Sequence, residues 1–340
     1  MKATTGGIFS IPATSMMTKL DTLVAILKDA PDEVFIQPHN VPDPDAIASS
    51  LGMYYLLSQR GIKKLAIVYD QAIEKANSLK MLELFKVPII QASEAHTLGS
   101  EDWAVLIDAQ KGNANLTDLP TDEVAAIDHH EYKGKKGYRF EDIRPNVGSC
   151  SAIIAEWFFE NNIEPPRIIA TALLYGIFMD TDNLTRGASD FDIEMFYRLY
   201  SISDIDLIVE LKGNELSVMD LELYAEAFRT VEIYDELAFL RLRNVNDSLL
   251  GAAGDIVISV AGVNIVVAYA VRENGIKLSI RSTCPSVKAN DLVRYLTEGC
   301  GVGGGHDNMA GGFIPKENLK EARVLDTFIK HRAIAYYEKR

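Results

Sequence analysis

Acidic and histidine residues recur at four places where an apolar segment of the chain ends. The four groups are His39 with Asp43 and Asp45; Asp108; Asp128 with His129 and His130; and Asp180 with Asp182. Imidazole nitrogens and carboxylate oxygens together form a ligand set suited to Mn²⁺, Mg²⁺ or Zn²⁺. Carboxylates that lie close together repel one another unless protons or cations neutralise them. Four carboxylates and two imidazoles suffice for two metal ions, and such a pair activates water and stabilises the oxygens of an in-line phosphoryl displacement.

Each group taken alone also has a simpler explanation. Asp108 could be a helix cap or turn residue after a strand. Asp43 is a good N-cap, because Pro44 follows it at the first helical position. His129 and His130 could be a surface pair. However, four of the six histidines lie in these groups or in the glycine-rich segment described next. The coincidence of all the groups therefore favours a metal site.

A second candidate for binding is the glycine-rich segment 299–306, which ends in Gly304, Gly305 and His306. Glycines let backbone N–H groups approach an anion closely, and His306 could add a donor to a phosphate. The simpler explanation is a flexible turn. The segment formally matches G-x-G-x-x-G, but a predicted helix precedes it and none follows, so a dinucleotide site is discounted. Arg281 and Ser282 follow a predicted strand. Arginine binds phosphate in a bidentate manner, although a strand-end arginine is more often simply solvated.

The elements that would position these residues alternate between strands and helices. Apolar runs predict strands over 33–37, 65–69, 103–107 and 124–127, and the spacing predicts helices over 45–59 and 74–85. The strands are apolar throughout, as in a parallel sheet with helices on both faces. Ligands of such sheets bind at the carboxyl ends of the strands, which is where three of the four groups lie.

The pattern changes in the second part of the chain. Residues 149 to about 211 are predicted to be helical, and one further helix is predicted over 216–228. Short strands over 237–245, 256–260, 265–271 and 276–280, with helices over 289–297 and 319–336, then indicate a smaller α+β domain. We therefore expect an α/β protein with a first domain over 1–210, a helical linker over 211–228 and a second domain over 229–340.

Composition and charge limit the class of protein. The 340 residues are 48% apolar and 24% charged, which is typical of globular domains and excludes a disordered or low-complexity chain. The net charge is −14, and residues 1–224 account for it with 19 basic and 34 acidic residues, whereas residues 225–340 have 15 and 14. An acidic half argues against binding of long duplex nucleic acid, which depends on phosphate neutralisation. The nearly neutral second half is then the better holder of an anionic substrate.

Three cysteines without a C-x-x-C pair indicate neither a structural zinc site nor a disulfide framework. No apolar run reaches the roughly 20 residues of a membrane-spanning helix. The longest, 256–271, is broken by Gly262 and Asn264, so two strands and a turn are predicted there. We expect a cytoplasmic protein that does not bind membranes.

The motifs together resemble those of the DHH phosphoesterases. His39-x-x-x-Asp43-x-Asp45, Asp108, Asp128-His129-His130 and Asp180 resemble their four motifs, in the same order, and 303–306 resembles the signature of their DHHA1 substrate domain. The resemblance covers residues from about 20 to 320. The length resembles the compact branch, which includes oligoribonuclease/pAp phosphatases and cyclic-di-AMP or pApA phosphodiesterases. Met179 and Ala48 depart from residues common in relatives, which affects the assignment to a subfamily rather than the metal site.

The resemblance implies two divalent ions in the first domain, Mn²⁺ in the first place, with Mg²⁺ or Co²⁺ as alternatives. By motif position, the implied metal ligands are His39 and Asp43 for one ion, Asp45 and His129 for the other, Asp108 as a bridge, and Asp180. His130 would lie near the scissile phosphate, so that His130 and Asp108 form the catalytic pair. The implied substrate-binding residues of the second domain are Arg281, Ser282, Gly304, Gly305 and His306.

The leading hypothesis is a metal-dependent phosphohydrolase that acts on short oligonucleotides or small nucleotides. Two alternatives stay open: an exopolyphosphatase, because phosphate binding alone does not reveal a base, and a non-catalytic nucleotide or metal sensor on the same fold. The sequence does not choose among nanoRNA, pAp, pApA, cyclic di-AMP and polyphosphate as substrate, and a homodimer is left open.

Overall fold

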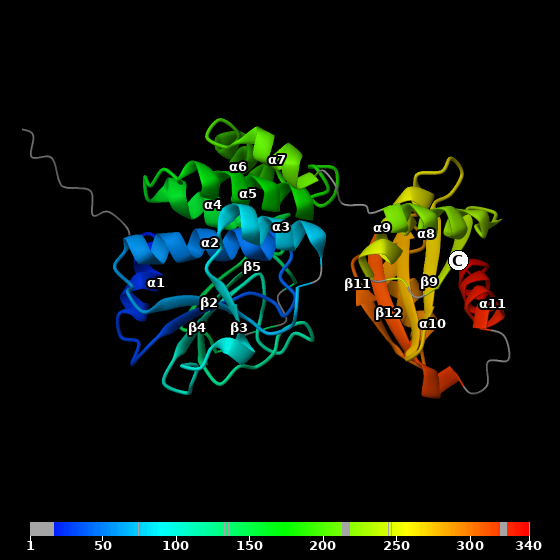
Figure 1. Cartoon of the computed structure of the whole chain (residues 1–340), viewed down its shortest axis with the longest axis horizontal. Helices are drawn as coiled ribbons and strands as arrows, with labels where there is room; N and C mark the ends of the chain where they lie inside the picture. Colours follow the sequence, from blue (N-terminus) through cyan, green and yellow to red (C-terminus); the bar gives the residue numbers. More distant parts are fainter. Residues whose placement is uncertain are drawn as a thin grey trace, which may run out of the picture. The chain divides into compact units, whose positions relative to one another are not determined.

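The computed structural model describes residues 17–73, 75–131, 134, 137–212, 218–243, 245, 247–319 and 325–339. The chain divides into two compact units, Met1–Glu215 and Leu216–Arg340 (Figure 1). Each unit has its own sheet and its own hydrophobic core, and each is described by itself below. Among the helices of the residues just given, none is long and apolar enough to cross a membrane.

The sheet of unit 1 has six strands, and every pairing in it is parallel. The strands are β1 (Val34–Gln37), β2 (Leu65–Tyr69), β3 (Ile89–Gln91), β4 (Trp103–Ile107), β5 (Asp122–Asp128) and β6 (Phe140–Ile143). Their order in the sheet is β3-β2-β1-β4-β5-β6. The direction in which the chain adds strands therefore reverses between β1 and β4, and ligands of open α/β sheets bind at the carboxyl ends of the strands beside such a point.

Seven α-helices belong to unit 1 within the described residues. They are α1 (Lys19–Leu27), α2 (Pro44–Gln59), α3 (Ala76–Phe85), α4 (Cys150–Glu160), α5 (Arg167–Asp180), α6 (Asp190–Tyr200) and α7 (Ile205–Lys212). All of them contribute side chains to one core, which lies against a single face of the sheet. In Figure 1 the helices α2, α4 and α5 lie on this face, with α6 and α7 beyond them.

The second face of this sheet is also covered, but by different elements. Its apolar side chains pack with the 3₁₀ helix η1 (Ala92–Glu94) and with loop residues such as Leu119 and Leu116. Helices thus contribute to the cover of both faces, as predicted: α-helices cover one face, and a 3₁₀ helix with loops covers the other. The apolar strands predicted burial on both sides, which the structure confirms, but they carry no information about which element supplies the cover.

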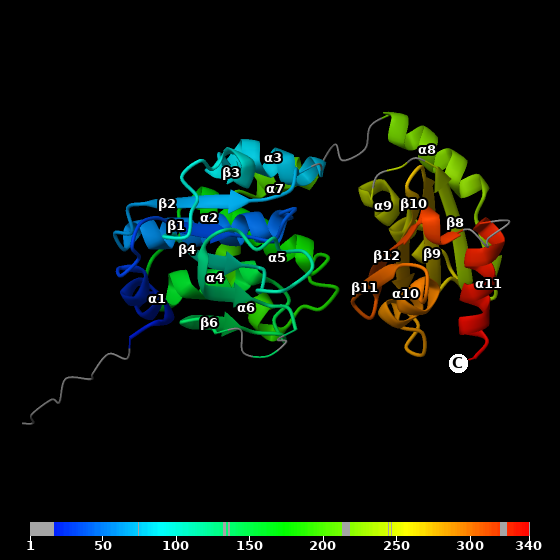
Figure 2. The same ribbon diagram turned by 90° about the horizontal axis from the view of Figure 1, so that it is seen from below.

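The sheet of unit 2 is mixed, with the order β11-β12-β10-β9-β8-β7. Its strands are β7 (Glu232–Tyr234), β8 (Leu237–Arg243), β9 (Ile265–Arg272), β10 (Gly275–Ser282), β11 (Val302–Gly305) and β12 (Met309–Pro315). Among the described strands of this sheet, only β8 and β9 pair in parallel, and α9 (Asp247–Ile258) connects them (Figure 2). The helices α10 (Ala289–Thr297) and α11 (Leu325–Tyr337) pack on one face of the sheet, and α8 (Val218–Arg229) and α9 pack on the other. The 3₁₀ helix η2 (Lys316–Leu319) follows β12.

Two predictions for unit 2 were wrong. Residues 256–260 were predicted as a strand, but 256–258 form the end of α9 and 259–260 the turn after it. The helix forms because Leu249, Leu250, Ala253 and Val257 recur at helical spacing and bury one face against the sheet. The glycine-rich segment was predicted as a loop, but its residues Val302–Gly305 pair with β12 as a strand. Of the other predicted elements, the helix over 74–85 begins at Ala76, after a residue outside the described ones, and the last helix begins at Leu325, because 320–324 lie outside them too.

Candidate metal centre

The candidate ligands of unit 1 come from loops at the carboxyl ends of β1, β4 and β5, and from the end of α5. His39 follows β1, and Asp43 is the N-cap of α2, where its Oδ1 accepts hydrogen bonds from the backbone N–H groups of Asp45 and Ala46, each at 3.1 Å. Asp43 therefore caps α2 and lies in the ligand cluster at the same time. Asp45 lies in the first turn of α2, whose N1 residue is Pro44, as predicted.

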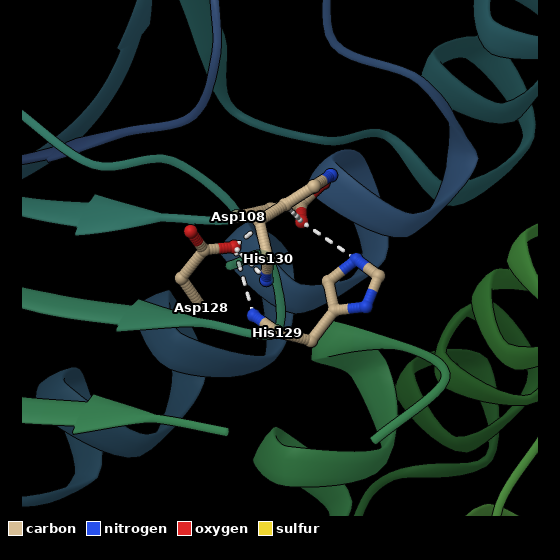
Figure 3. Close-up of side chains that lie close together, drawn as sticks. All are labelled: Asp108, Asp128, His129 and His130. Atoms are coloured by element: carbon tan, nitrogen blue, oxygen red, sulfur yellow. Dashed lines mark hydrogen bonds and ion pairs between the residues drawn. The ribbon is translucent and has the colours of Figure 1, made fainter. Parts of the chain in front are cut away.

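Asp108 lies at the centre of the cluster. It follows β4 directly and has a left-handed backbone with φ +55°, which turns the chain away from the sheet. Its carboxylate lies 3.7 Å from His39 Nε2, 3.3 Å from His129 Nε2 and 3.5 Å from His130 Nδ1. Figure 3 shows Asp108 together with Asp128, His129 and His130. One carboxylate thus contacts all three histidines, which is the position that a bridging ligand requires.

The six predicted metal ligands converge in the structure. His39 Nε2 lies 3.8 Å from Asp43 Oδ1, and His129 Nε2 lies 3.0 Å from Asp180 Oδ2 and 4.0 Å from Asp45 Oδ2. Candidate ligand atoms within 4.8 Å of one another form three overlapping groups: His39, Asp43 and Asp108; Asp45, His129 and Asp180; and Asp108, Asp128, His129 and His130. The first two groups divide the six residues into two sets of three.

The tautomer of His129 fits metal ligation. Its Nδ1 lies 3.2 Å from the carbonyl oxygen of Val147, which can only accept, so Nδ1 carries the proton. In the neutral ring, Nε2 then has the lone pair. This buried Nε2, like the buried Oδ1 of Asp108, has no partner of good hydrogen-bond geometry among the described residues. Buried polar atoms normally have partners, and these two atoms are therefore suited to hold a metal.

Electrostatics in the cluster also favour a cation. Burial raises the pKa of Asp108, and burial together with the charges of Asp108 and Asp180 raises the pKa of Asp45 well above its ordinary value. Burial lowers the pKa of His129, but the carboxylates of Asp108 and Asp180 outweigh it, so that the pKa is raised well above 6.5. The cluster therefore takes up protons when no metal neutralises its carboxylates. A divalent cation would neutralise the negative charge of these carboxylates in place of the protons.

Asp128 and His130, the two residues of the third group that are not predicted metal ligands, form a hydrogen-bonded chain with Gln110. His130 Nδ1 lies 2.8 Å from Asp128 Oδ1, and Asp128 Oδ2 accepts a hydrogen bond of 2.7 Å from Gln110 Nε2. Burial lowers the pKa of His130, but the contact with Asp128 and the charge of Asp108 raise it to about 9. Asp128 is fully buried, whereas the His130 side chain is 34% exposed. His130 is thus held at the edge of the cluster with a positive charge.

Sequence reasoning missed the backbone groups that orient these ligands. Asp45 accepts hydrogen bonds from the N–H groups of Cys150 and Ser151, at 2.7 and 2.8 Å, in the first turn of α4. A carboxylate at a helix N-terminus is stabilised by the helix dipole. Gln110 was also missed, although its position two residues after Asp108 could have suggested it. The Val147 carbonyl and the two N–H groups are main-chain atoms, so the types of the residues in the sequence do not reveal their contacts.

In unit 2, the structure places two of the predicted substrate-binding residues inside the protein. Arg281 is 8% exposed, and its Nε and Nη2 donate to Asp255 of α9 at 2.6 and 3.2 Å. Its Nη1 donates to Ser279 Oγ at 2.9 Å. The Ser282 hydroxyl is buried and donates to the Val287 carbonyl at 2.5 Å. In this conformation both side chains are engaged within unit 2, and a role in substrate binding stays a prediction that requires them to exchange partners.

The predicted glycines and His306 lie on or next to β11. A Cβ at Gly305, which has φ +149°, would lie 2.6 Å from Ala310 Cα and from Met309 O, so only glycine fits. At Gly304, by contrast, a Cβ would meet nothing within 4 Å. The backbone N–H of His306 donates to the Met309 carbonyl at 2.7 Å, and its side chain is exposed. Packing therefore explains Gly305 but not Gly304.

Comparison with known proteins agrees with this architecture. The N-terminal domain of the DHH family matches residues 33–177, and the DHHA1 domain matches residues 235–330. The chain therefore belongs to the DHH phosphoesterase family, with a DHH domain followed by a DHHA1 domain.

Two proteins of similar sequence and one solved structure are similar to the chain. The uncharacterized protein MJ1633 of Methanocaldococcus jannaschii is 29% identical over 85% of this chain, which spans 59% of that protein. A probable manganese-dependent inorganic pyrophosphatase of Streptococcus thermophilus is 31% identical over 44% of this chain and 48% of its own length. Among solved structures, an exopolyphosphatase-related protein from Bacteroides fragilis matches with a TM-score of 0.76 and 20% identity, over 97% of this chain and 99% of the other. That similarity shows a shared fold.

Proposed function

We propose that the protein is a metal-dependent phosphohydrolase that cleaves phosphodiester or phosphomonoester bonds of short oligonucleotides or small nucleotides. The observation that carries the proposal is the convergence of six ligand side chains, four carboxylates and two imidazoles, around Asp108. Carboxylates packed this closely repel one another unless protons or cations neutralise them, and divalent ions fit the donor set.

The donor set fits two divalent ions of the Mn²⁺ or Mg²⁺ type. Its atoms are carboxylate oxygens and imidazole nitrogens, and no cysteine sulfur belongs to the groups found among the described residues. We assign His39, Asp43 and Asp108 to one ion, and Asp45, His129, Asp180 and Asp108 to the other. The chemistry that divalent ions supply in such a site is activation of water and neutralisation of charge on phosphoryl oxygens. The Streptococcus thermophilus relative, named as probably manganese-dependent, supports Mn²⁺.

In this proposal His130 contributes a positive charge and a hydrogen bond to the phosphoryl group. Asp128 holds its Nδ1, so the ring presents Nε2 on the opposite side, and Gln110 holds Asp128 in turn. A preorganised donor of this kind stabilises the charge that develops in the transition state. Asp128 and Gln110 do not touch the substrate in this scheme and act as positioning residues.

Unit 2 would bind the non-reacting part of the substrate. Gly304 is the strongest support, because no packing contact requires glycine there, whereas an approaching ligand would. His306, exposed next to it, can donate to an anionic oxygen. If Arg281 takes part, its guanidinium has to leave Asp255, which is 54% exposed and can be solvated in its place. Hydrolysis of a small substrate then depends on both units.

A competition assay tests the proposal and separates it from its alternatives. Purified full-length protein with Mn²⁺ is supplied with pApA, pAp, cyclic di-AMP, short RNA, polyphosphate and pyrophosphate. The proposal predicts that one of the nucleotide substrates has the highest kcat/KM, and that EDTA abolishes its hydrolysis. Preference for polyphosphate or pyrophosphate would instead favour the phosphoanhydride chemistry suggested by the names of two relatives. Binding without hydrolysis of any of them would favour a sensor.

Two variants refine the test of substrate binding. Gly304→Ala is sterically tolerated, so any rise in KM reports on the ligand rather than on folding. Gly99→Ala is a matched control in unit 1: like Gly304, Gly99 lacks a left-handed backbone, and its Cβ would meet no atom nearer than 3.9 Å. The control is expected to leave KM unchanged. Equal KM values for the wild type and Gly304→Ala would remove this glycine from the substrate site.

A further inference from the structure

Asp192 is a fully buried carboxylate that lies outside the candidate ligand cluster. It is in the first turn of α6 and forms a capping box with Ser189, whose backbone N–H and hydroxyl donate to Asp192 Oδ2 at 2.9 and 2.5 Å. No cation is paired with it among the described residues. A capping box explains the contacts with Ser189, but it does not require Asp192 to be buried or to contact any other element.

The same carboxylate also binds the turn that begins α4. The N–H of Gly148 donates to Asp192 Oδ2 at 2.7 Å, and the Ser149 hydroxyl lies 3.1 Å from Oδ1. Ser149 is itself the N-cap of α4. A Cβ at Gly148 would lie 3.0 Å from Asp192 Oδ2 and 2.8 Å from the Gly187 carbonyl, so the approach of α6 to this turn is close. Asp192 therefore fixes residues 148 and 149 from a helix that is 44 positions further along the chain.

The turn held by Asp192 is continuous with the backbone groups that orient two candidate ligands. Immediately before it, the Val147 carbonyl contacts His129 Nδ1 at 3.2 Å. Immediately after it, the N–H groups of Cys150 and Ser151 donate to the two oxygens of Asp45. A shift of the turn would move both ligands together, because all three contacts are made by main-chain atoms of five consecutive residues.

Asp192 also holds the end of the loop that follows Asp180, which is the third residue of the ligand group Asp45, His129 and Asp180. Residues 182, 183 and 184 of this loop all have left-handed backbones, with φ of +47°, +58° and +66°. Such conformations are costly for residues other than glycine and persist where surrounding contacts enforce them. The loop ends at Ser189, which Asp192 holds by its N–H and its hydroxyl.

We infer that Asp192 is a positioning residue for one half of the metal centre, namely the ion assigned to Asp45, His129 and Asp180. The inference rests on the proposed function. The other ion, assigned to His39, Asp43 and the shared Asp108, is held by residues that follow β1 and β4, and within the described part of the chain no hydrogen bond or ion pair joins Asp192 to them. Replacing Asp192 thus weakens one ion and spares the other.

The test is a titration of metal-depleted, full-length protein with Mn²⁺, followed by calorimetry, for the wild type, Asp192→Asn and Ser189→Ala. Asp192→Asn keeps the shape of the side chain but loses one accepting oxygen. Ser189→Ala is the matched control: it removes the hydroxyl that caps α6 and donates to Asp192 Oδ2, but it keeps the backbone N–H of residue 189 on Asp192 and leaves Gly148 and Ser149 in place. Thermal unfolding of the metal-free proteins measures the structural effect of each change separately.

We expect Asp192→Asn to weaken one of two Mn²⁺ sites by about 10–100-fold, as replacement of outer-shell partners typically does, and to leave the other within about threefold. The weakened site should be the one that Asp180→Asn also weakens. Ser189→Ala should lower the melting temperature but leave both affinities within about threefold of the wild type. Equal affinities in Asp192→Asn and the wild type, or equal losses at both sites, would overturn the inference.

Ser149→Ala provides the same test if Asp192→Asn does not fold. It removes the contact with Asp192 Oδ1 and is expected to weaken the same ion by a smaller factor, about 3–10-fold. Unchanged affinity in a folded Ser149→Ala variant would then overturn the inference. A wild-type protein that binds no Mn²⁺ would overturn both the inference and the proposed function, whereas normal wild-type binding with an unaffected variant overturns the inference alone.

Discussion

Replacing Asp108 by asparagine separates its role in metal binding from its role in folding. In the metal-free protein the carboxylate is buried, and this burial raises its pKa although His129 and His130 lie 3.3 and 3.5 Å from its Oδ1. A raised pKa means that the fold disfavours the charged form of this group relative to the unfolded chain. Asparagine removes the charge, keeps the shape and tolerates the left-handed backbone at φ +55°. We therefore expect Asp108→Asn to leave the metal-free protein as stable as the wild type or slightly more stable.

With metal, the same substitution should have the opposite effect. At a Mn²⁺ concentration of about 100 times Kd, binding stabilises a native protein by about 2.7 kcal/mol. For a domain of about 200 residues this corresponds to a rise in Tm of roughly 5–10 °C, at about 2–4 °C per kcal/mol. Because Asp108 contacts the residues of both ion sites, Asp108→Asn should lose most of this rise, and hydrolysis should fall by well over tenfold.

Differential scanning fluorimetry of both proteins, with Mn²⁺ and with EDTA, measures these shifts. Asp108→Ala is the control for backbone conformation, because alanine pays about 1–2 kcal/mol for the left-handed backbone and should lower Tm in EDTA as well. A Mn²⁺-dependent rise in Tm of Asp108→Asn equal to that of the wild type would refute the reasoning. So would turnover within about tenfold of the wild type, a change of only ~1.4 kcal/mol in the barrier.

Three further predictions concern packing, acid stability and substrate binding. Gly52→Ala should destabilise unit 1 by about 1–3 kcal/mol in urea unfolding, because its Cβ would lie 2.7 Å from Ile154 Cγ2; no loss of stability would show that α2 and α4 can separate. Burial raises the pKa of Asp142, but the contact with Arg144 outweighs burial, so the net shift of this pKa is downward. The Asp142 carboxylate therefore stabilises the fold fully above its unfolded pKa of about 3.9. This contribution is lost as the pH falls through the lower pKa of the folded state. The stability difference between the wild type and Asp142→Asn should accordingly shrink below about pH 4, and a difference that grows on acidification would contradict the pairing. His306→Ala should keep its full metal content by elemental analysis and raise KM; loss of metal would contradict its assignment to substrate binding.

The ligand cluster could be predicted from sequence because its residues follow apolar strands. Asp108 directly follows β4 and His129 directly follows β5, and parallel strands bring their carboxyl ends to one edge whatever the details of the loops. Asp180 was harder, because it ends a helix and the sheet does not place it. Its residue type grouped it with the others, and the resemblance to the family then implied that it is a ligand. The structure brings all of them together.

What could not be predicted depends on main-chain atoms or on long-range packing. The Val147 carbonyl and the N–H groups of α4 act through the backbone, so residue types give no sign of them. Arg281 was expected to face a substrate, but Gly251 and Gly254 of α9 make room for its side chain, and Asp255 pairs with it. This contact spans two elements, one of which was itself predicted partly as a strand. The glycines of 299–306 suggested a loop because their packing against β12 is visible only in three dimensions.

The most direct test of the metal centre is anomalous scattering at the manganese edge from crystals of the full-length protein grown with Mn²⁺. The account predicts two peaks about 3.5–4 Å apart. Both should contact Asp108, with His39 and Asp43 at one and Asp45, His129 and Asp180 at the other. Peaks only at other acidic surfaces, or no peak within coordination distance of Asp108, would contradict it.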